Sequence, residues 1–101
     1  MIVAVALFEL HIEFAQSLKE KRMVVRSLRA KLRDRFEISA AEVAYQDLHQ
    51  RARIAISFVT AERTLAEGLL EKVQDFVETN TDATLTGWTS ELLDFDEEAG
   101  L

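Results

Sequence analysis

Two segments of the chain alternate apolar side chains with the two-residue period of a β-strand. In residues 2–14 every even position is apolar, and in residues 51–60 the side chains of Ala52, Ile54, Ile56 and Phe58 share one face. Because strand side chains alternate between the two faces of a sheet, both segments predict strands with a buried face. The first segment is apolar at its odd positions too, as far as Leu7, so we expect it at the centre of the sheet.

Two other segments have helical periodicity. Ser17 and Glu20 form an S-x-x-E capping box, which predicts a helix beginning at Leu18. A second helix is expected over about 61–79 with Thr60 as its cap. Each helix has one apolar stripe to bury. The first stripe comprises Leu18, Val25, Leu28, Leu32 and Phe36, and the second comprises Leu65, Leu69, Val73, Phe76 and Val77, with Leu70 beside it.

Residues 37–45 and 83–93 are predicted as the remaining strands, which makes the element order β-α-β-β-α-β. In a chain of 101 residues this order predicts a single α+β domain. We expect a ferredoxin-like sandwich, an antiparallel four-stranded sheet with two helices on one face. The domain is assigned to residues 1–93, and the acidic tail, residues 94–101, is predicted to fray.

The helices of such a sandwich leave the second sheet face uncovered. The first strand directs Val3, Val5 and Leu7 to that face. Large exposed apolar patches are rare in monomers, so we expect a homo-oligomer that associates through the open sheet face.

One run, Ser17-Leu-Lys-Glu-Lys-Arg22, is distinctive. Together with Glu9–Ile12 and Gln46–Ala52, it makes roughly residues 1–93 resemble the YlxP-like family of small bacterial proteins. The resemblance implies a ferredoxin-like fold and no established activity. Members are often encoded among genes for translation initiation and ribosome maturation, which implies a connection with the ribosome or RNA.

Positive charge is concentrated on the first predicted helix, although the net charge is −6. Residues 17–36 hold eight of the twelve basic residues and two of the eighteen acidic ones, so this segment is about +6. Five cations recur at spacings of three and four residues beside the apolar stripe. We call them the basic stripe: Lys19, Arg22, Arg26, Arg29 and Arg33.

The basic stripe has three interpretations. Lysine and arginine displace counterions from phosphates, which favours binding to structured RNA, such as ribosomal RNA. In the second interpretation, the basic stripe docks an acidic protein partner or the acidic tail of another copy. In the third, it is a solvated helix face whose charges balance nearby acidic residues of the same chain. RNA stacking on the sheet is not expected, because the open face carries Arg51, Arg53, Ala55 and Ser57 and no aromatic side chain.

Two polar clusters are further candidates. Glu9, His11 and Glu13 share one strand face and offer ligands for a divalent metal, as in a small-ligand or metal sensor. The alternative is a polar strand end in which His11 is hydrogen-bonded. A cluster of polar loop residues is either a second binding surface or a set of residues that stabilise the turn, with a salt bridge between Asp47 and Arg51. Its members are Gln46, Asp47, Gln50 and Arg51.

Several functional classes find no support in the sequence. The chain has no cysteine, which excludes disulfides and thiolate metal sites. It has no nucleophile motif or glycine-rich phosphate loop, so no catalytic residue, no enzyme activity and no cofactor is expected. No apolar run approaches the roughly 18 residues of a membrane helix, and the N-terminus lacks the features of a signal peptide. A cytoplasmic binding module is expected.

Overall fold

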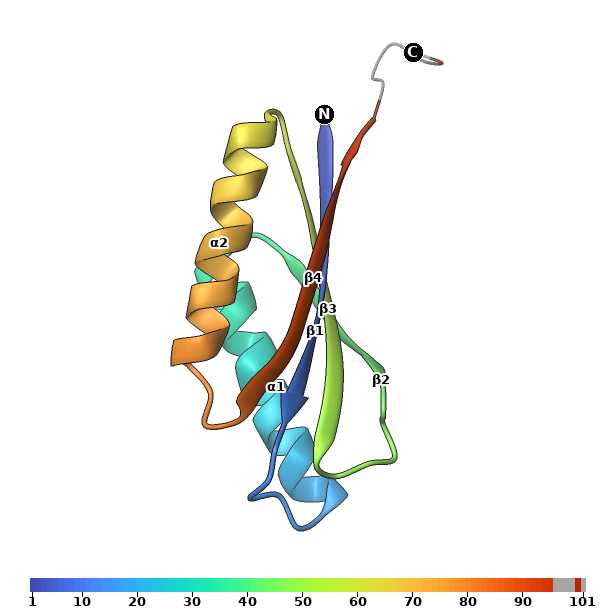
Figure 1. The fold of residues 1–101 in the computed structure, drawn as a ribbon, viewed down its shortest axis with the longest axis vertical. Coiled ribbons are helices and arrows are strands. Elements are labelled where there is room, and N and C mark those ends of the chain that lie inside the picture. Colours follow the sequence, from blue (N-terminus) through green and yellow to red (C-terminus); the bar gives the residue numbers. More distant parts are fainter. Residues whose placement is uncertain (96–99, 101) are drawn as a thin grey trace.

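The computed structural model describes residues 1–95 and 100 and shows the predicted order of elements. The strands form one antiparallel sheet in the order β2-β3-β1-β4, and both helices lie on the same side of it (Figure 1). This is the ferredoxin-like α+β arrangement that the sequence predicts. The elements are β1 (Ile2–His11), α1 (Leu18–Arg35), β2 (Ser39–Ala44), β3 (Arg51–Thr60), α2 (Arg63–Thr79) and β4 (Thr84–Asp94).

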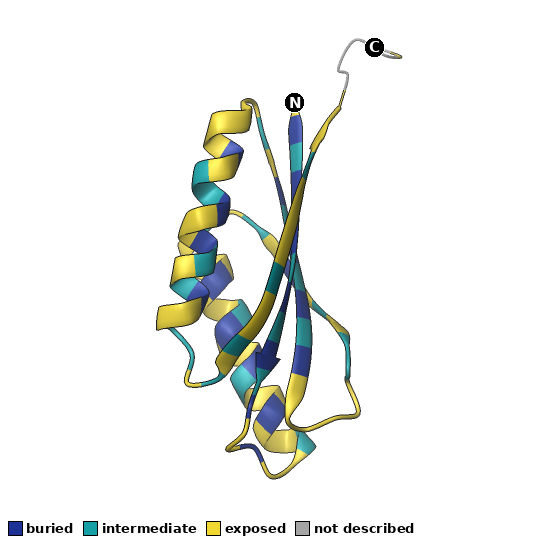
Figure 2. Cartoon of the chain, viewed as in Figure 1, coloured by how far each residue is buried: buried dark blue, intermediate teal, exposed yellow. Residues whose placement is uncertain are grey.

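The core lies between the helices and the even side chains of β1. These side chains are at most 5% exposed from Ile2 to Leu10, whereas the odd side chains on the open face are half-buried (Figure 2). β3 presents Ala52, Ile54 and Ile56 to the same core. Strand β1 therefore has the central place that its apolar odd positions indicate.

Helix α1 begins where the capping box predicts. The Glu20 backbone N–H donates to Ser17 Oγ at 3.1 Å, and the Gln16 N–H donates to the Glu20 carboxylate at 2.7 Å. These two bonds satisfy donors that would otherwise be orphaned at the helix start. Val25, Leu28 and Leu32 of the predicted stripe are buried against the sheet, and Leu18 and Phe36 at its ends are half-buried.

Helix α2 differs from the prediction in its cap and in its buried face. Glu62 is the N-cap residue, and the Thr60 hydroxyl donates to the Glu62 carbonyl at 2.9 Å instead of capping the helix. Leu65, assigned to the buried stripe, is 59% exposed. The prediction followed large side chains, whereas the helix packs on the sheet through the small Ala66 and turns Leu65 outward. The buried set is Ala66, Leu70, Val73 and Val77.

The last strand extends past its predicted end. Asp94 lies within β4, and the Phe95 backbone N–H donates to the Met1 carbonyl at 2.9 Å, so the predicted fraying at residue 94 is wrong. The rest of the predicted tail, apart from Gly100, lies outside the described residues.

Trp88 of β4 stacks on Phe8 with ring centroids 5.4 Å apart. Of the helices described, none is both long and apolar enough to cross a membrane.

Candidate functional site

Four members of the basic stripe lie exposed on α1. Lys19, Arg22, Arg26 and Arg33 have no ion-pair partner within residues 1–95. From Lys19 to Arg33 the helix rises about 21 Å, so the charges form a line along one flank of α1. Such a line of uncompensated cations suits an extended anion more than a single small one.

The fifth member, Arg29, has a structural role. Its Nε donates to the Ala40 carbonyl of β2 at 3.1 Å, and the side chain is half-buried. β2 is an edge strand, and an edge carbonyl without a partner invites pairing with another chain. Arg29 covers this carbonyl, so it contributes less than its neighbours to any external contact. It also shows that the basic stripe faces the β2 edge of the sheet.

Lys21 is a buried cation that the sequence analysis did not single out. Its side chain is 1% exposed, and its Nζ lies 2.8 Å from a carboxylate oxygen of Glu42, which is itself 16% exposed. The same Nζ donates to the Tyr45 carbonyl. Lys21 therefore ties the first turn of α1 to the end of β2 and to the loop that follows it.

Tyr45 organises the β2–β3 loop. Its φ of 64° lies in the left-handed region, which non-glycine residues seldom adopt. The guanidinium groups of Arg51 and Arg53 lie over its ring, 4.1 and 5.1 Å from the ring centroid, in cation–π contact. The tyrosine hydroxyl also accepts a 3.1 Å hydrogen bond from each arginine. The ring is thus engaged by protein cations and is not free to stack a base.

Glu9 completes this cluster from β1. Its carboxylate accepts from Arg53 Nε at 2.9 Å and from the Arg53 terminal nitrogen, and it accepts from Arg51 at 3.3 Å. The Arg53 hydrogen bond holds the pKa of the Glu9 carboxyl below its ordinary value, and Glu9 in turn raises the pKa of Arg53. The cluster joins β1 and β3 across the register pair Glu9–Arg53.

The predicted metal site is not assembled. No three His, Asp or Glu side chains lie close enough to share a metal ion in the part of the chain that the structure describes. Glu9 is occupied by two guanidinium groups, and β1 ends at His11, so exposed Glu13 lies in the next loop and leaves the strand face. Half-buried His11 lines a cavity of about 300 Å³ with Leu48, His49, Gln50 and Arg51.

The predicted loop cluster separates into individual roles. Gln50 donates to the carbonyls of Glu13 and Ala15 at 3.2 and 3.4 Å and so joins two loops. Gln46 reaches the Glu42 carbonyl at 3.5 Å. Arg51 pairs with Glu9, so the expected Asp47–Arg51 salt bridge is wrong, and Asp47 is exposed. The loop residues therefore support the fold more than they form one binding surface.

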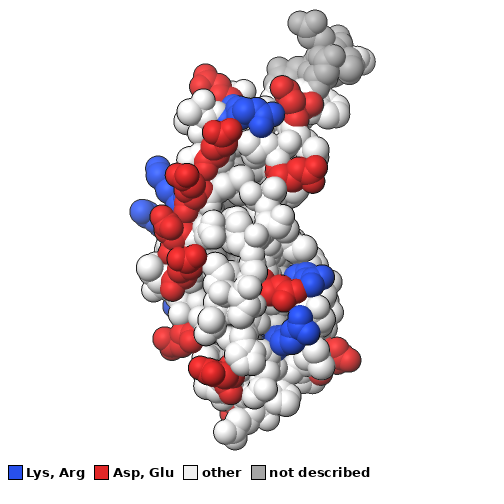
Figure 3. Space-filling model, in the orientation of Figure 1, with Lys and Arg blue, Asp and Glu red and all other residues white. Residues whose placement is uncertain are grey.

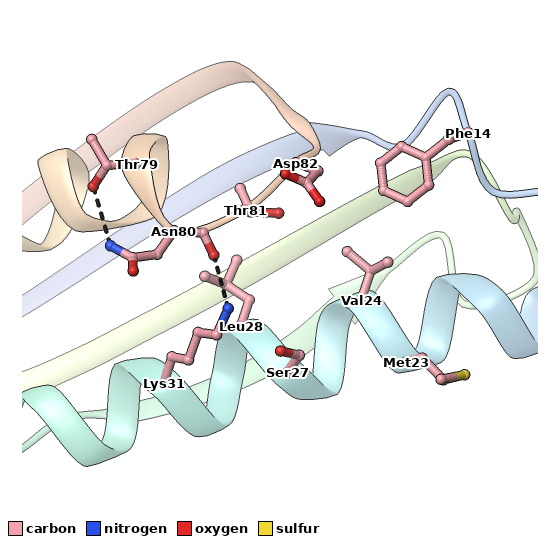
Figure 4. A pocket seen from close by; sticks show the side chains of 10 residues that line it. All are labelled: Phe14, Met23, Val24, Ser27, Leu28, Lys31, Thr79, Asn80, Thr81 and Asp82. Atoms are coloured by element: carbon pink, nitrogen blue, oxygen red, sulfur yellow. Dashed lines mark hydrogen bonds between the residues drawn. The ribbon is translucent and has the colours of Figure 1, made fainter.

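A cavity of about 470 Å³ lies between α1 and the turn that follows α2 (Figure 4). Sequence analysis missed it, because three separate segments supply its walls. α1 contributes Met23, Val24, Ser27, Leu28 and Lys31, the loop after β1 contributes Phe14, and the turn contributes Thr79, Asn80, Thr81 and Asp82.

Comparison with protein families places the chain. The model of a family described as "Protein of unknown function (DUF503)" matches residues 3–89. The chain belongs to this family. The matched segment includes the whole basic stripe, Lys21 with its partner Glu42, and every residue that lines the cavity between α1 and the turn after α2.

A curated relative agrees with this assignment. The "Uncharacterized protein YlxP" of Bacillus subtilis (strain 168) is 36% identical over 64 residues, which cover 63% of this chain and 70% of that protein. The resemblance to the YlxP-like family is thereby confirmed. Among solved structures, that of At3g17210 from Arabidopsis thaliana has a TM-score of 0.47 at 14% identity, covering 93% of this chain and 95% of that one.

Proposed function

We propose that this protein is a non-enzymatic module that binds structured RNA through the basic stripe of α1. The observation that carries the proposal is the line of four exposed cations, Lys19, Arg22, Arg26 and Arg33, none paired within the described chain. Successive phosphates of an RNA strand offer such a line a matching row of negative charges. Membership of the DUF503 family is compatible with the proposal and assigns no activity.

The rest of the surface restricts where a polyanion can bind. Acidic side chains gather along α2 (Figure 3), where Glu67, Glu71, Asp75 and Glu78 are exposed. With a net charge of −6, the body of the protein repels RNA, whereas the basic stripe attracts it. This segregation favours one binding orientation over coating of the whole surface.

The test is a titration of ribosomal RNA across a salt series. Four phosphate contacts predict that affinity falls on the order of 100-fold between 50 and 200 mM salt. The variant Arg22→Glu/Arg26→Glu leaves the edge contact of Arg29 intact, and we expect it to bind at least about tenfold more weakly, with a shallower salt slope. Fluorescence anisotropy with labelled RNA gives both quantities.

The matched control is Arg63→Glu/Lys72→Glu on α2, which changes the net charge by the same amount at two exposed sites. We expect it to retain most of the affinity. Equal weakening of both variants would show a net-charge effect and contradict a binding face on α1. Absence of RNA binding at low salt would overturn the proposal and leave an acidic protein partner as the alternative.

The open sheet face is the surface through which we propose that two copies associate. The register places Val59, Val3 and Leu93 side by side in one row, and Val5 and Leu7 continue the apolar surface. Three strands of ten or eleven residues and the six-residue β2, spaced about 4.8 Å apart, give a face of about 600 Å². This approaches the roughly 800 Å² per partner of a stable interface, with the Glu9–Arg53 pair at its rim.

Val5→Arg places a charge in the middle of this face and is expected to convert a dimer into a monomer. Leu65→Arg, at an exposed apolar position on α2, is the control and should leave the dimer intact. Size-exclusion chromatography with light scattering measures the mass of each. A wild-type protein with the mass of one chain would refute the association.

A further inference from the structure

The sheet has two edge strands, β2 and β4, of which β2 is the better protected. β2 has six residues, its pairing with β3 is irregular, and Arg29 covers the Ala40 carbonyl. Short strands, irregular pairing and positive side chains are means by which proteins keep an edge from pairing. β4 has eleven residues, no proline and no lysine or arginine, and its register with β1 is continuous from Gly87 to Asp94. It therefore offers a long edge to a further strand.

The register shows which backbone groups of β4 are available. The Phe95 N–H donates to the Met1 carbonyl at 2.9 Å, and the Met1 ammonium group donates to the Phe95 carbonyl at 3.3 Å, so the two residues form a hydrogen-bonded pair. Bonded and non-bonded pairs alternate along an antiparallel ladder, so every second residue of β4 turns its N–H and C=O away from β1. Among the described residues, no further strand, loop or side chain bonds to these groups. The residues are Trp88, Ser90, Leu92 and Asp94.

The side chains of these four residues point to the helix side of the sheet. They lie opposite even residues of β1, which face the core, and Trp88 stacks on Phe8. A strand added antiparallel to β4 forms its hydrogen-bonded pairs with the same four residues, and directly opposed residues share a face. The residues of the added strand that exchange backbone hydrogen bonds with β4 therefore direct their side chains to the side on which α2 lies (Figure 1).

Helix α2 places a row of acidic side chains beside this edge. Figure 1 looks onto β4, which passes in front of β1 and β3, and Figure 3 shows acidic side chains along α2 next to an uncharged band. Three alternate side chains of a strand span about 13 Å, which matches a row that rises about 16 Å along the helix. The row comprises Glu67, Glu71, Asp75 and Glu78, which are exposed and have no ion-pair partner within residues 1–95.

We propose that the β4 edge binds an extended segment of another protein that carries lysine or arginine at every second position. The segment adds a strand antiparallel to β4, and its basic side chains lie toward the acidic row of α2. Charge disfavours two other occupants. The acidic row repels RNA, and a second copy joined β4 to β4 would bring two acidic rows to the same side of one sheet. The site is separate from the basic stripe, which faces the β2 edge.

The probe is a fluorescein-labelled peptide, Thr-Lys-Val-Lys-Val-Lys-Thr, titrated at low salt and followed by anisotropy. N-methylation of its lysines removes the N–H groups that pair with β4 and should weaken binding at least about tenfold. N-methylation of its valines, whose N–H groups point away from β4, should be tolerated. The two methylated peptides carry the same charge, so equal binding of both, or no binding of the unmodified peptide, would overturn the inference.

Ser90→Pro is the matching change on the protein, because the Ser90 N–H points away from β1 and proline is tolerated at such edge positions. We expect it to weaken the peptide about tenfold, whereas Ser90→Ala keeps the N–H and should bind as wild type. Glu71→Gln/Asp75→Asn should weaken binding roughly threefold to tenfold. Arg22→Glu/Arg26→Glu, which tests RNA binding, should not weaken it, so the two proposals fail separately.

Hydrogen exchange on the wild-type protein gives a readout that needs no variant. The peptide should protect the amides of Ser90 and Leu92, whereas those of Thr89 and Glu91 already bond to β1 and should change little. Binding without this alternating protection would place the peptide elsewhere and refute the site. Protection of Ser90 and Leu92 in the protein alone, lost on dilution, would show that a second copy occupies the edge and would also refute it.

Discussion

Replacing Lys21 with alanine is expected to lower the free energy of unfolding by about 3–5 kcal/mol, the usual effect of breaking a buried ion pair. The substitution leaves the Glu42 carboxylate, 16% exposed, without the ammonium group that lies 2.8 Å from it. It also removes the donor to the Tyr45 carbonyl at a backbone position with a φ of 64°. Because a domain of this size has about 5–15 kcal/mol of stability, the loss is a large fraction of the total.

Urea unfolding followed by Trp88 fluorescence measures this effect. Lys19→Ala changes the same residue type two positions earlier, at an exposed site, and should change stability by no more than about 0.5 kcal/mol. The double variant Lys21→Met/Glu42→Leu removes both charges and should recover most of the loss. If Lys21→Ala and Lys19→Ala unfold at the same urea concentration, the buried pair does not stabilise the fold.

Lys21 shows where sequence reasoning reached its limit on α1. The capping box and the apolar stripe predicted the helix and most of its buried face. Lys21 lies three residues after Leu18 and four before Val25, which places it within that face. Lysine is rarely buried, so the predicted buried stripe does not include it. Its partners, Glu42 and the Tyr45 carbonyl, become its neighbours only through the tertiary fold.

The candidate sites also divide into features that the sequence pattern predicts and features that depend on the tertiary fold. Four members of the basic stripe are exposed as predicted, because helical spacing alone determines the face on which they lie. Arg29 differs because its acceptor is a backbone carbonyl, which leaves no trace in the sequence. The Glu9 carboxylate was assigned to a metal because the sequence does not give the register that places Arg53 opposite it. The cavity between α1 and the turn after α2 is absent from the predictions because its walls come from three segments that only the fold brings together.

Phe8→Ala and Phe14→Ala are expected to have very different effects on stability. The alternation in residues 2–14 places both rings on one buried strand face. In the structure β1 ends at His11, so Phe8 is 1% exposed and stacks on Trp88, whereas Phe14 is 46% exposed at the rim of the cavity. We expect Phe8→Ala to cost about 3–5 kcal/mol through lost burial and a residual cavity. Phe14→Ala should cost less than about 1 kcal/mol, because its ring already contacts water.

Circular dichroism during urea unfolding is the suitable measurement, since Phe8→Ala also changes the surroundings of Trp88. Similar losses in the two variants would mean that Phe14 is packed in the core, contrary to its exposure in the structure. A small loss for Phe14→Ala beside a large loss for Phe8→Ala would show that the buried apolar face ends with β1 at His11, although the alternation in the sequence continues to residue 14.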